Sequence, residues 1–230
     1  MRLVYSKILS IIVLAFVLTA CNSSVSSSKV EQRIIFPSYS VYYDAEAQTL
    51  TATVAFQTDN ESGDYIKLSK NSSISFNQQS MKQLSDGEKE CFYMCTQKDV
   101  EAFPDRLNFE YQNDDGDVFT NELKLKSIQI SDFRLNKNEV NVIQYKGKDI
   151  DEDETITLIL KNGDKQYEIL PDVGDNHQML IDNSMLRDVK SGSYEGYLLR
   201  TSYSTGVNAM DRDGSAETTY HSKIYTITIQ

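Results

Sequence analysis

From Arg33 to the C-terminus, apolar and polar residues alternate with a period of two, and no long stretch repeats every 3.6 residues. The segment 49–57 is the clearest case: apolar residues stand at every second position from Leu50 to Phe56, with threonine or alanine between them. This pattern predicts a half-buried antiparallel strand. The chain ends in the same way, with Ile227 and Ile229 alternating with Thr226 and Thr228, which predicts a core strand. The alternation therefore predicts an all-β fold.

Two turn sequences predict where consecutive strands fold back on each other. Alternating residues up to Tyr111 are followed by Asn113-Asp114-Asp115-Gly116, after which the alternation resumes. A second alternating run reaches Leu160 and is followed by Asn162-Gly163, the strongest short hairpin signal. Each sequence predicts a β-hairpin.

The alternation changes phase near the middle of the chain without an intervening turn residue. Leu123 and Leu125 occupy odd positions, whereas Ile128 and Ile130 occupy even positions. Such a change indicates a bulge or a transfer to another sheet. We therefore predict a domain boundary at Lys126 to Ser127, which gives two units, 33–126 and 127–230, of a size typical of β-sandwiches.

The second unit contains a short motif with a known structural parallel. One helical turn is predicted in 183–189, capped by Asn183 or Ser184, before Gly192-Ser193-Tyr194 and a strand. This arrangement resembles the E to F corner of immunoglobulin-like domains, where the tyrosine hydroxyl bonds to the backbone. The second half is also similar in pattern to uncharacterised Gram-negative lipoproteins with such domains. The resemblance implies two tandem immunoglobulin-like β-sandwiches.

The first twenty residues have the features of a signal peptide. Arg2 and Lys7 precede an apolar run, 8–17, that is long enough for a signal-peptide core and short for a membrane span. The run ends in Leu18-Thr19-Ala20-Cys21, which resembles the lipobox of bacterial lipoproteins. The resemblance implies cleavage before Cys21 and anchoring in a lipid bilayer through acyl chains such as palmitate on that residue.

The residues after Cys21 predict how and where the folded part is held. The segment 21–32 begins with a run of small polar residues, which predicts a flexible tether close to the membrane. In enterobacterial lipoproteins an aspartate after the lipidated cysteine retains the protein in the inner membrane. Asn22 at that position resembles the class sorted to the outer membrane. We therefore expect the protein to be lipid-anchored in the outer membrane.

Composition excludes nucleic acid as a partner. The chain has 34 acidic residues against 23 lysines and arginines, a formal charge of -11, and no basic stripe. Proteins hold a phosphate backbone mainly through clustered lysine and arginine. No cofactor-binding motif is present either, so no cofactor is expected.

The thiols Cys91 and Cys95 could form a local disulfide in an oxidising compartment. In an extended strand their Cα atoms would lie about 13 Å apart, beyond the roughly 7 Å limit for a disulfide. Pairing therefore requires a turn. The sequence leaves open whether the segment forms a turn with a disulfide or an extended strand with two free thiols. A redox site is disfavoured because the spacing is not C-x-x-C.

Acidic turns suggest, at most, a weak cation site. Asn113 and Asp115 stand at calcium-ligand spacing, as do Asp211 and Asp213. The EF-hand pattern is incomplete in both cases, because its first position is Tyr111 in one and Ala209 in the other. A hairpin turn is the simpler interpretation, so this pattern alone does not assign a metal site. The acidic run 149–154 is interpreted as a solvated loop.

No catalytic motif is recognisable. Gly192 to Gly196 places its serine one position too early for G-x-S-x-G, and no H-E-x-x-H or P-loop occurs. His221 with scattered carboxylates could still serve a hydrolase, although a packed histidine is the simpler interpretation. The fourteen tyrosines suit either strand packing or sugar binding, with Tyr42-Tyr43 as the best exposed candidate.

The sequence thus predicts a lipid-anchored envelope protein that acts as a non-enzymatic binding or scaffold module for an envelope protein or glycan. Its alternatives are a periplasmic hydrolase and a calcium-stiffened adhesion or glycan-binding module.

Overall fold

The computed structural model describes residues 24–86, 90–101, 103–104, 106–174, 176–207 and 213–230. Among these residues there are β-strands and short 3-10 helices but no α-helix. No helix in these ranges is long and apolar enough to cross a membrane. The expectation of a mostly β protein is confirmed.

The elements up to residue 126 are β1 (Val25–Ser26), η1 (Ser27–Lys29), η2 (Gln32–Ile34), β2 (Ile35–Asp44), β3 (Thr49–Thr58), β4 (Ile66–Lys67), β5 (Ser73–Phe76), β6 (Gln79–Ser80), β7 (Lys82–Asp86), β8 (Glu90–Gln97), β9 (Arg106–Gln112) and β10 (Val118–Lys124). Those after residue 126 are β11 (Ile128–Gln129), β12 (Phe133–Leu135), β13 (Asn141–Gln144), β14 (Lys146–Gly147), β15 (Glu154–Asn162), β16 (Lys165–Ile169), β17 (Asp172–Gly174), β18 (Gln178–Ile181), η3 (Asn183–Leu186), β19 (Gly192–Val207), β20 (Gly214–His221) and β21 (Tyr225–Ile229).

One large sheet runs through both halves of the chain. Its strand order is β12-β21-β19-β20-β2-β3-β8-β7, and β15 pairs with the other side of β19. The sixteen-residue β19 pairs with β21 near its start, with β15 along its middle and with β20 towards its end. β20 then pairs in parallel with β2, from Ser38↔Ser215 to Asp44↔His221. Strands on either side of Lys126 thus share a sheet.

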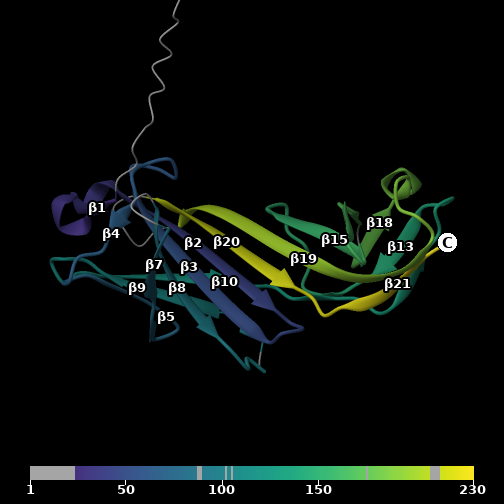
Figure 1. Ribbon diagram of the computed structural model, residues 1–230, viewed down its shortest axis with the longest axis horizontal. Helices are drawn as coiled ribbons and strands as arrows, with labels where there is room; N and C mark the ends of the chain where they lie inside the picture. Colours follow the sequence, from purple (N-terminus) through teal and green to yellow (C-terminus); the bar gives the residue numbers. More distant parts are fainter. Residues whose placement is uncertain (1–23, 87–89, 102, 105, 175, 208–212) are drawn as a thin grey trace, which may run out of the picture.

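Two smaller sheets are associated with opposite ends of the large one. In the first half, β10-β9-β5-β6 packs on β2 and β3 through aromatic pairs, including Tyr39 with Phe109 at 4.7 Å and Phe56 with Tyr111 at 4.8 Å between ring centroids. In the second half, β13-β18-β17 forms a separate sheet. Figure 1 shows the elongated result, with β1 and β4 at one end and the C-terminus at the other.

The main local expectations are confirmed. The inward residues of β3, from Leu50 to Phe56, are fully buried. Both hairpins form, with β9 paired to β10 and β15 paired to β16. In the first turn Gly116 has φ +91°, a conformation that glycine adopts without strain. The change of sheet also occurs, because β10 belongs to the first smaller sheet whereas β11 pairs with β14.

The corner before β19 forms as the resemblance implies. The 3-10 helix η3 buries Leu186 and is followed by buried Val189. The Tyr194 hydroxyl donates to the Lys190 carbonyl at 2.9 Å. The expected cap is wrong by one position, because the side chain of Asp182 accepts from the amide of Ser184.

The predicted flexible tether is wrong for the part of 21–32 that the structure describes beyond Ser24. β1 pairs in parallel with β4, and η1 and η2 follow it directly. Ser27 is buried because its hydroxyl has partners inside the molecule: it donates to Asp114 and accepts from the amide of Ser69. Small polar residues can therefore be buried when every hydrogen bond is satisfied.

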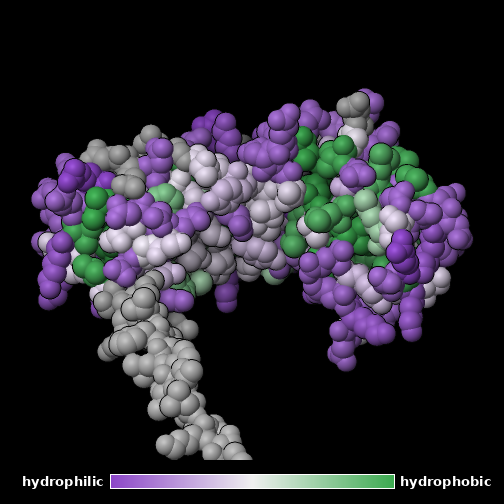
Figure 2. Space-filling model, turned by 90° about the horizontal axis from the view of Figure 1, so that it is seen from above, coloured by the Kyte–Doolittle hydropathy of each residue, from purple (hydrophilic) through white to green (hydrophobic). Residues whose placement is uncertain are grey.

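The two halves differ in their exposed apolar surface. Figure 2 shows apolar side chains gathered over the half that carries the C-terminus. The large aliphatic residues exposed in the described part of this half are Val140, Val142, Leu170, Val173 and Ile224.

Candidate functional site

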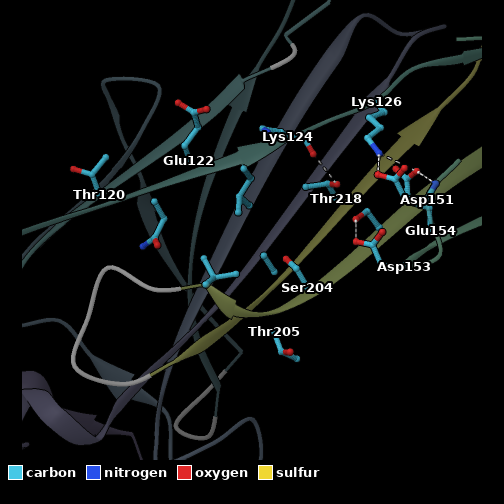
Figure 3. A pocket seen from close by; sticks show the side chains of 15 residues that line it. Thr120, Glu122, Lys124, Lys126, Asp151, Asp153, Glu154, Ser204, Thr205 and Thr218 are labelled. Atoms are coloured by element: carbon cyan, nitrogen blue, oxygen red, sulfur yellow. Dashed lines mark hydrogen bonds and ion pairs between the residues drawn. The ribbon is translucent and has the colours of Figure 1, made fainter. Parts of the chain in front are cut away.

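A polar cavity of about 480 Å³ lies where the two halves of the chain meet. One wall is β10, from Thr120 to Lys124, and the other is formed by β19 and β20. Asp151, Asp153 and Glu154 close the end nearest Lys126, as Figure 3 shows. We call this cavity the junction groove.

Among the described strands, two edges without a strand partner border the junction groove, whereas β20, which completes the second wall, is paired with β19 and β2. Within the described chain, β10 pairs only with β9, and the end of β19 beyond Tyr203 pairs only with β20. The Tyr203 amide itself donates to the Asp153 carbonyl at 3.4 Å. One edge carbonyl is already used, because the Thr218 hydroxyl donates to the Lys124 carbonyl at 3.3 Å. Unpaired strand edges can accept a further extended segment.

The lining of the groove is rich in hydroxyl groups. Thr120 lines the groove from β10, and Ser202 and Ser204 line it from one face of β19. Charged side chains of both signs stand at the rim, among them Glu122 and Lys124 (Figure 3). Such a lining offers hydrogen bonds but little apolar area, so it suits a polar ligand.

A buried ion pair supports the base of the groove. Arg200 on β19 is 2% exposed and Glu154 is 9% exposed. The Arg200 guanidinium donates twice to this carboxylate, from Nε to Oε1 at 3.2 Å and from Nη2 to Oε2 at 2.6 Å. A bidentate pair of this kind is stronger and more directional than a single hydrogen bond.

The remaining donors of Arg200 hold three backbone carbonyls. Nη1 donates to Ser127 at 3.2 Å and to Lys148 at 2.8 Å, and Nη2 donates to Asp149 at 2.5 Å. The guanidinium has five N–H donors, and the structure gives each a partner. This one side chain therefore joins β19, the loop before β15 and the segment where the chain changes sheet.

Lys126 completes the cluster from the cavity side. Its Nζ donates to Asp151 Oδ2 at 2.5 Å and to Glu154 Oε2 at 3.1 Å. Burial opposes the charged form of Lys126, yet the two carboxylates outweigh it and raise its pKa. Burial likewise opposes the charge on Glu154, but hydrogen bonds from Arg200, the Asp151 amide and Lys126 lower its pKa overall. Both groups are therefore charged at neutral pH.

Sequence reasoning missed this cluster. Glu154 ends the acidic run 149–154, for which we predicted a solvated loop, and that prediction is wrong for Glu154 because Arg200 and Lys126 pair with it. One signal was available: Arg200 stands in the inward phase of β19, two residues after buried Leu198. An arginine in a buried phase requires an acidic partner.

The predicted lipidation site, Cys21, lies outside the described residues. Cys91 and Cys95 are both free and buried in β8. They occupy the same face of an extended strand, so the disulfide considered above is not formed. Burial raises the pKa of both thiols. The Cys95 thiol instead donates to Gln79 Oε1 at 3.4 Å.

The candidate cation ligands have other roles or lie apart. The Asn113 side chain is buried: its Oδ1 accepts from the amides of Asp115 and Asp117, and its amide donates to the Asp117 carboxylate. Asp213 lines a different pocket with Glu61, and Asp211 lies outside the described residues. The described part of the chain contains no group of three or more acidic, histidine or cysteine side chains that could hold a metal ion.

His221 is packed rather than placed in the groove. Its ring lies 4.0 Å from that of Tyr197 and 6.1 Å from that of Tyr42, between centroids. Its Nδ1 lies 3.5 Å from the Asp44 carboxylate without forming a hydrogen bond. Burial lowers the pKa of His221, which opposes a charged pair with Asp44.

Of the adjacent tyrosines, Tyr42 is 38% exposed and Tyr43 is buried, as their alternation in β2 predicts.

Comparison of the sequence with protein-family models and with curated proteins finds no match.

Proposed function

We propose that this chain is a lipid-anchored bacterial envelope protein that works as a non-enzymatic binding module, and that the junction groove holds an extended polar segment of its partner. The observation that carries the proposal is that the open edge of β10 and the unpaired end of β19 border one hydroxyl-lined cavity. Backbone N–H and C=O groups on such edges can bind an added strand, and the neighbouring side chains can select its sequence.

The groove is preorganised for binding. Arg200 fixes its base through five hydrogen bonds, so little conformational entropy remains to be lost there when a ligand binds. Glu122 and Lys124 point to the same side of β10, because they are two residues apart in a strand. A partner with alternating charges would match this wall.

The chemistry of the lining supports binding rather than hydrolysis. Among the described residues, those that line the groove include neither histidine nor cysteine. A hydrogen bond from Lys126 lowers the pKa of Asp151. Despite burial, hydrogen bonds from Arg200 and other partners lower the pKa of Glu154. Both side chains are therefore carboxylates at neutral pH. Carboxylates already committed to ion pairs are poor general acids.

The finer architecture and location belong to the same proposal. The Tyr194 corner supports an immunoglobulin-like second sandwich, and the change of sheet after Leu125 supports a boundary at Lys126 to Ser127. In this proposal one sheet joins the two tandem sandwiches, because β2 of the first pairs with β20 of the second. Cys21 within a lipobox supports the lipid anchor, and Asn22 supports sorting to the outer membrane.

The test is photo-crosslinking in intact envelopes. A photoreactive residue is placed at Glu122 or Ser204 in the groove, and at Lys165 or Glu168 on β16 as exposed controls. The proposal predicts the same crosslinked species from both groove positions and none from β16. Crosslinks of equal yield at all four positions, or none in the groove, would count against it.

A further inference from the structure

The segment that follows Cys21 is bound to the folded body almost from its start. The amide of Val25 donates to the Tyr65 carbonyl at 2.8 Å, and β1 continues in register with β4 through Val25↔Ile66 and Ser26↔Lys67. Ile66 is fully buried, so this pairing is attached to the core rather than to a loop.

Ser27 fixes the same point from a second direction. Its hydroxyl donates to Asp114 Oδ2 at 2.7 Å and accepts from the Ser69 amide at 2.8 Å. The Ser69 hydroxyl donates to the other oxygen of Asp114. The turn between β9 and β10 therefore holds the beginning of the described chain.

Four residue steps separate Cys21 from Val25. Even a fully extended chain covers only about 14 Å over this length. A headgroup layer is about 5 to 8 Å thick, half the difference between the full bilayer and its hydrocarbon core. A lipid on Cys21 would thus keep Val25 within about two headgroup layers of the membrane.

We infer, on the basis of the proposed lipid anchor, that the end formed by β1, β4, η1 and the β9–β10 turn rests on the lipid headgroups, and that the C-terminal half projects away from them. Figure 1 places β1 and β4 at one end of the long axis and the C-terminus at the other. From Val118 at the turn, β10 rises six steps, or about 20 Å, to Lys124. The junction groove then opens above the membrane, where a partner can reach it.

Tether length rather than charge sets this orientation. Lys29, Lys67 and Lys70 are exposed at the anchored end, but Asp115 and Asp117 of the adjacent turn are exposed as well. Attraction to anionic lipids is therefore weak. The orientation should persist in about 1 M salt, where the Debye length is about 3 Å.

The experiment uses the acylated full-length chain in vesicles of phosphatidylethanolamine and phosphatidylglycerol with a headgroup-linked quencher. A fluorophore is attached at Asn71→Cys near β1, at Lys124→Cys beside the groove, or at Gln230→Cys at the C-terminus; all three positions are exposed. The unsubstituted chain reports labelling of the buried native thiols. We expect strong quenching at 71, several-fold weaker quenching at 124, and none at 230.

Two variants test whether the short, bound segment after Cys21 sets the orientation. A Gly-Ser spacer of about twenty residues between Ser24 and Val25, with a root-mean-square span of about 25 Å, should reduce quenching at 71. The double substitution Ser27→Ala and Asp114→Ala should act in the same direction by releasing the bound segment. Equal quenching at all three positions, on a chain that still co-sediments with the vesicles, would overturn the orientation but not the anchor. Loss of quenching at 71 in high salt would do the same. A chain that carries no acyl group on Cys21 and stays off the vesicles would overturn the anchor as well.

Discussion

Arg200 and Glu154 form a bidentate ion pair inside the molecule, with N–O distances of 3.2 and 2.6 Å, although the two residues are 46 positions apart. The pair lies where the large sheet passes from one half of the chain to the other. Because Arg200 also holds the carbonyls of Ser127, Lys148 and Asp149, its removal should affect the whole junction.

Arg200→Met is expected to lower the free energy of unfolding by about 3 to 5 kcal/mol, because it leaves Glu154 buried without its main partner. Urea denaturation at neutral pH measures the effect. Arg33→Met is the matched control, since the Arg33–Glu31 pair is exposed and its loss should leave the free energy of unfolding nearly unchanged. Equal effects of the two substitutions would show that the buried cluster does not support the junction.

Acid should weaken this cluster. The folded-state pKa of Glu154 lies below its ordinary value of 4.5, despite the opposing effect of burial. An acid with a lowered pKa stabilises the fold fully above its unfolded pKa, and this contribution is lost as pH falls through the folded value. The free energy of unfolding should therefore decrease below about pH 4.5. Glu154→Gln should be less stable at pH 7, but its free energy of unfolding should decrease less steeply below about pH 4.5. The same slope as in the unsubstituted chain would contradict the assignment of this pH dependence to Glu154.

The hydrogen bond of the corner before β19 should contribute measurably to stability. Tyr194→Phe removes the donor to the Lys190 carbonyl and is expected to cost about 1 kcal/mol. Tyr203→Phe is the comparison, because Tyr203 is 47% exposed and its hydroxyl bonds to Glu61 at the surface. Thermal or urea denaturation compares them, and a larger loss in Tyr203→Phe would refute the corner's structural role.

The thiols of Cys91 and Cys95 should be reduced and unreactive in the native protein. Both are buried, and burial raises their pKa, so the reactive thiolate is scarce. A maleimide reagent should label them slowly in buffer and rapidly in denaturant. A mass lower by two hydrogens under non-reducing conditions would instead reveal the disulfide.

Calcium should leave the melting temperature unchanged. The side chain of Asn113 is fully used within its turn, and a ligand that binds only the native state would stabilise it by about 2.7 kcal/mol at one hundred times its Kd. Calorimetry with calcium and with a chelator makes the comparison. A melting temperature that rises with calcium concentration would restore the adhesion-module alternative.

Local patterns predicted much of this fold because their causes are local. The alternation around Leu50, the glycine at 116 and the motif before Tyr194 each act within about a dozen residues. The parallel pairing of β2 with β20 joins segments some 180 positions apart, and no local pattern specifies it. The candidate site was missed for the same reason, since the partners Arg200 and Glu154 meet only after β15 pairs with β19.

The bound segment after Ser24 shows a different limit. Composition predicted flexibility because Asn22 to Ser28 is small and polar. The structure buries Ser27 because Asp114 and Ser69, distant in sequence, satisfy its hydroxyl. Composition describes what a segment can do alone, whereas its burial depends on partners elsewhere in the chain.

The most direct test of the lipid-anchor proposal is mass spectrometry of the mature N-terminus from the membrane fraction, with Cys21→Ser as the control. The proposal predicts a chain that begins at Cys21 and carries acyl groups there, and a soluble, unacylated Cys21→Ser chain. An unmodified Cys21, with the protein found in the soluble fraction, would contradict it.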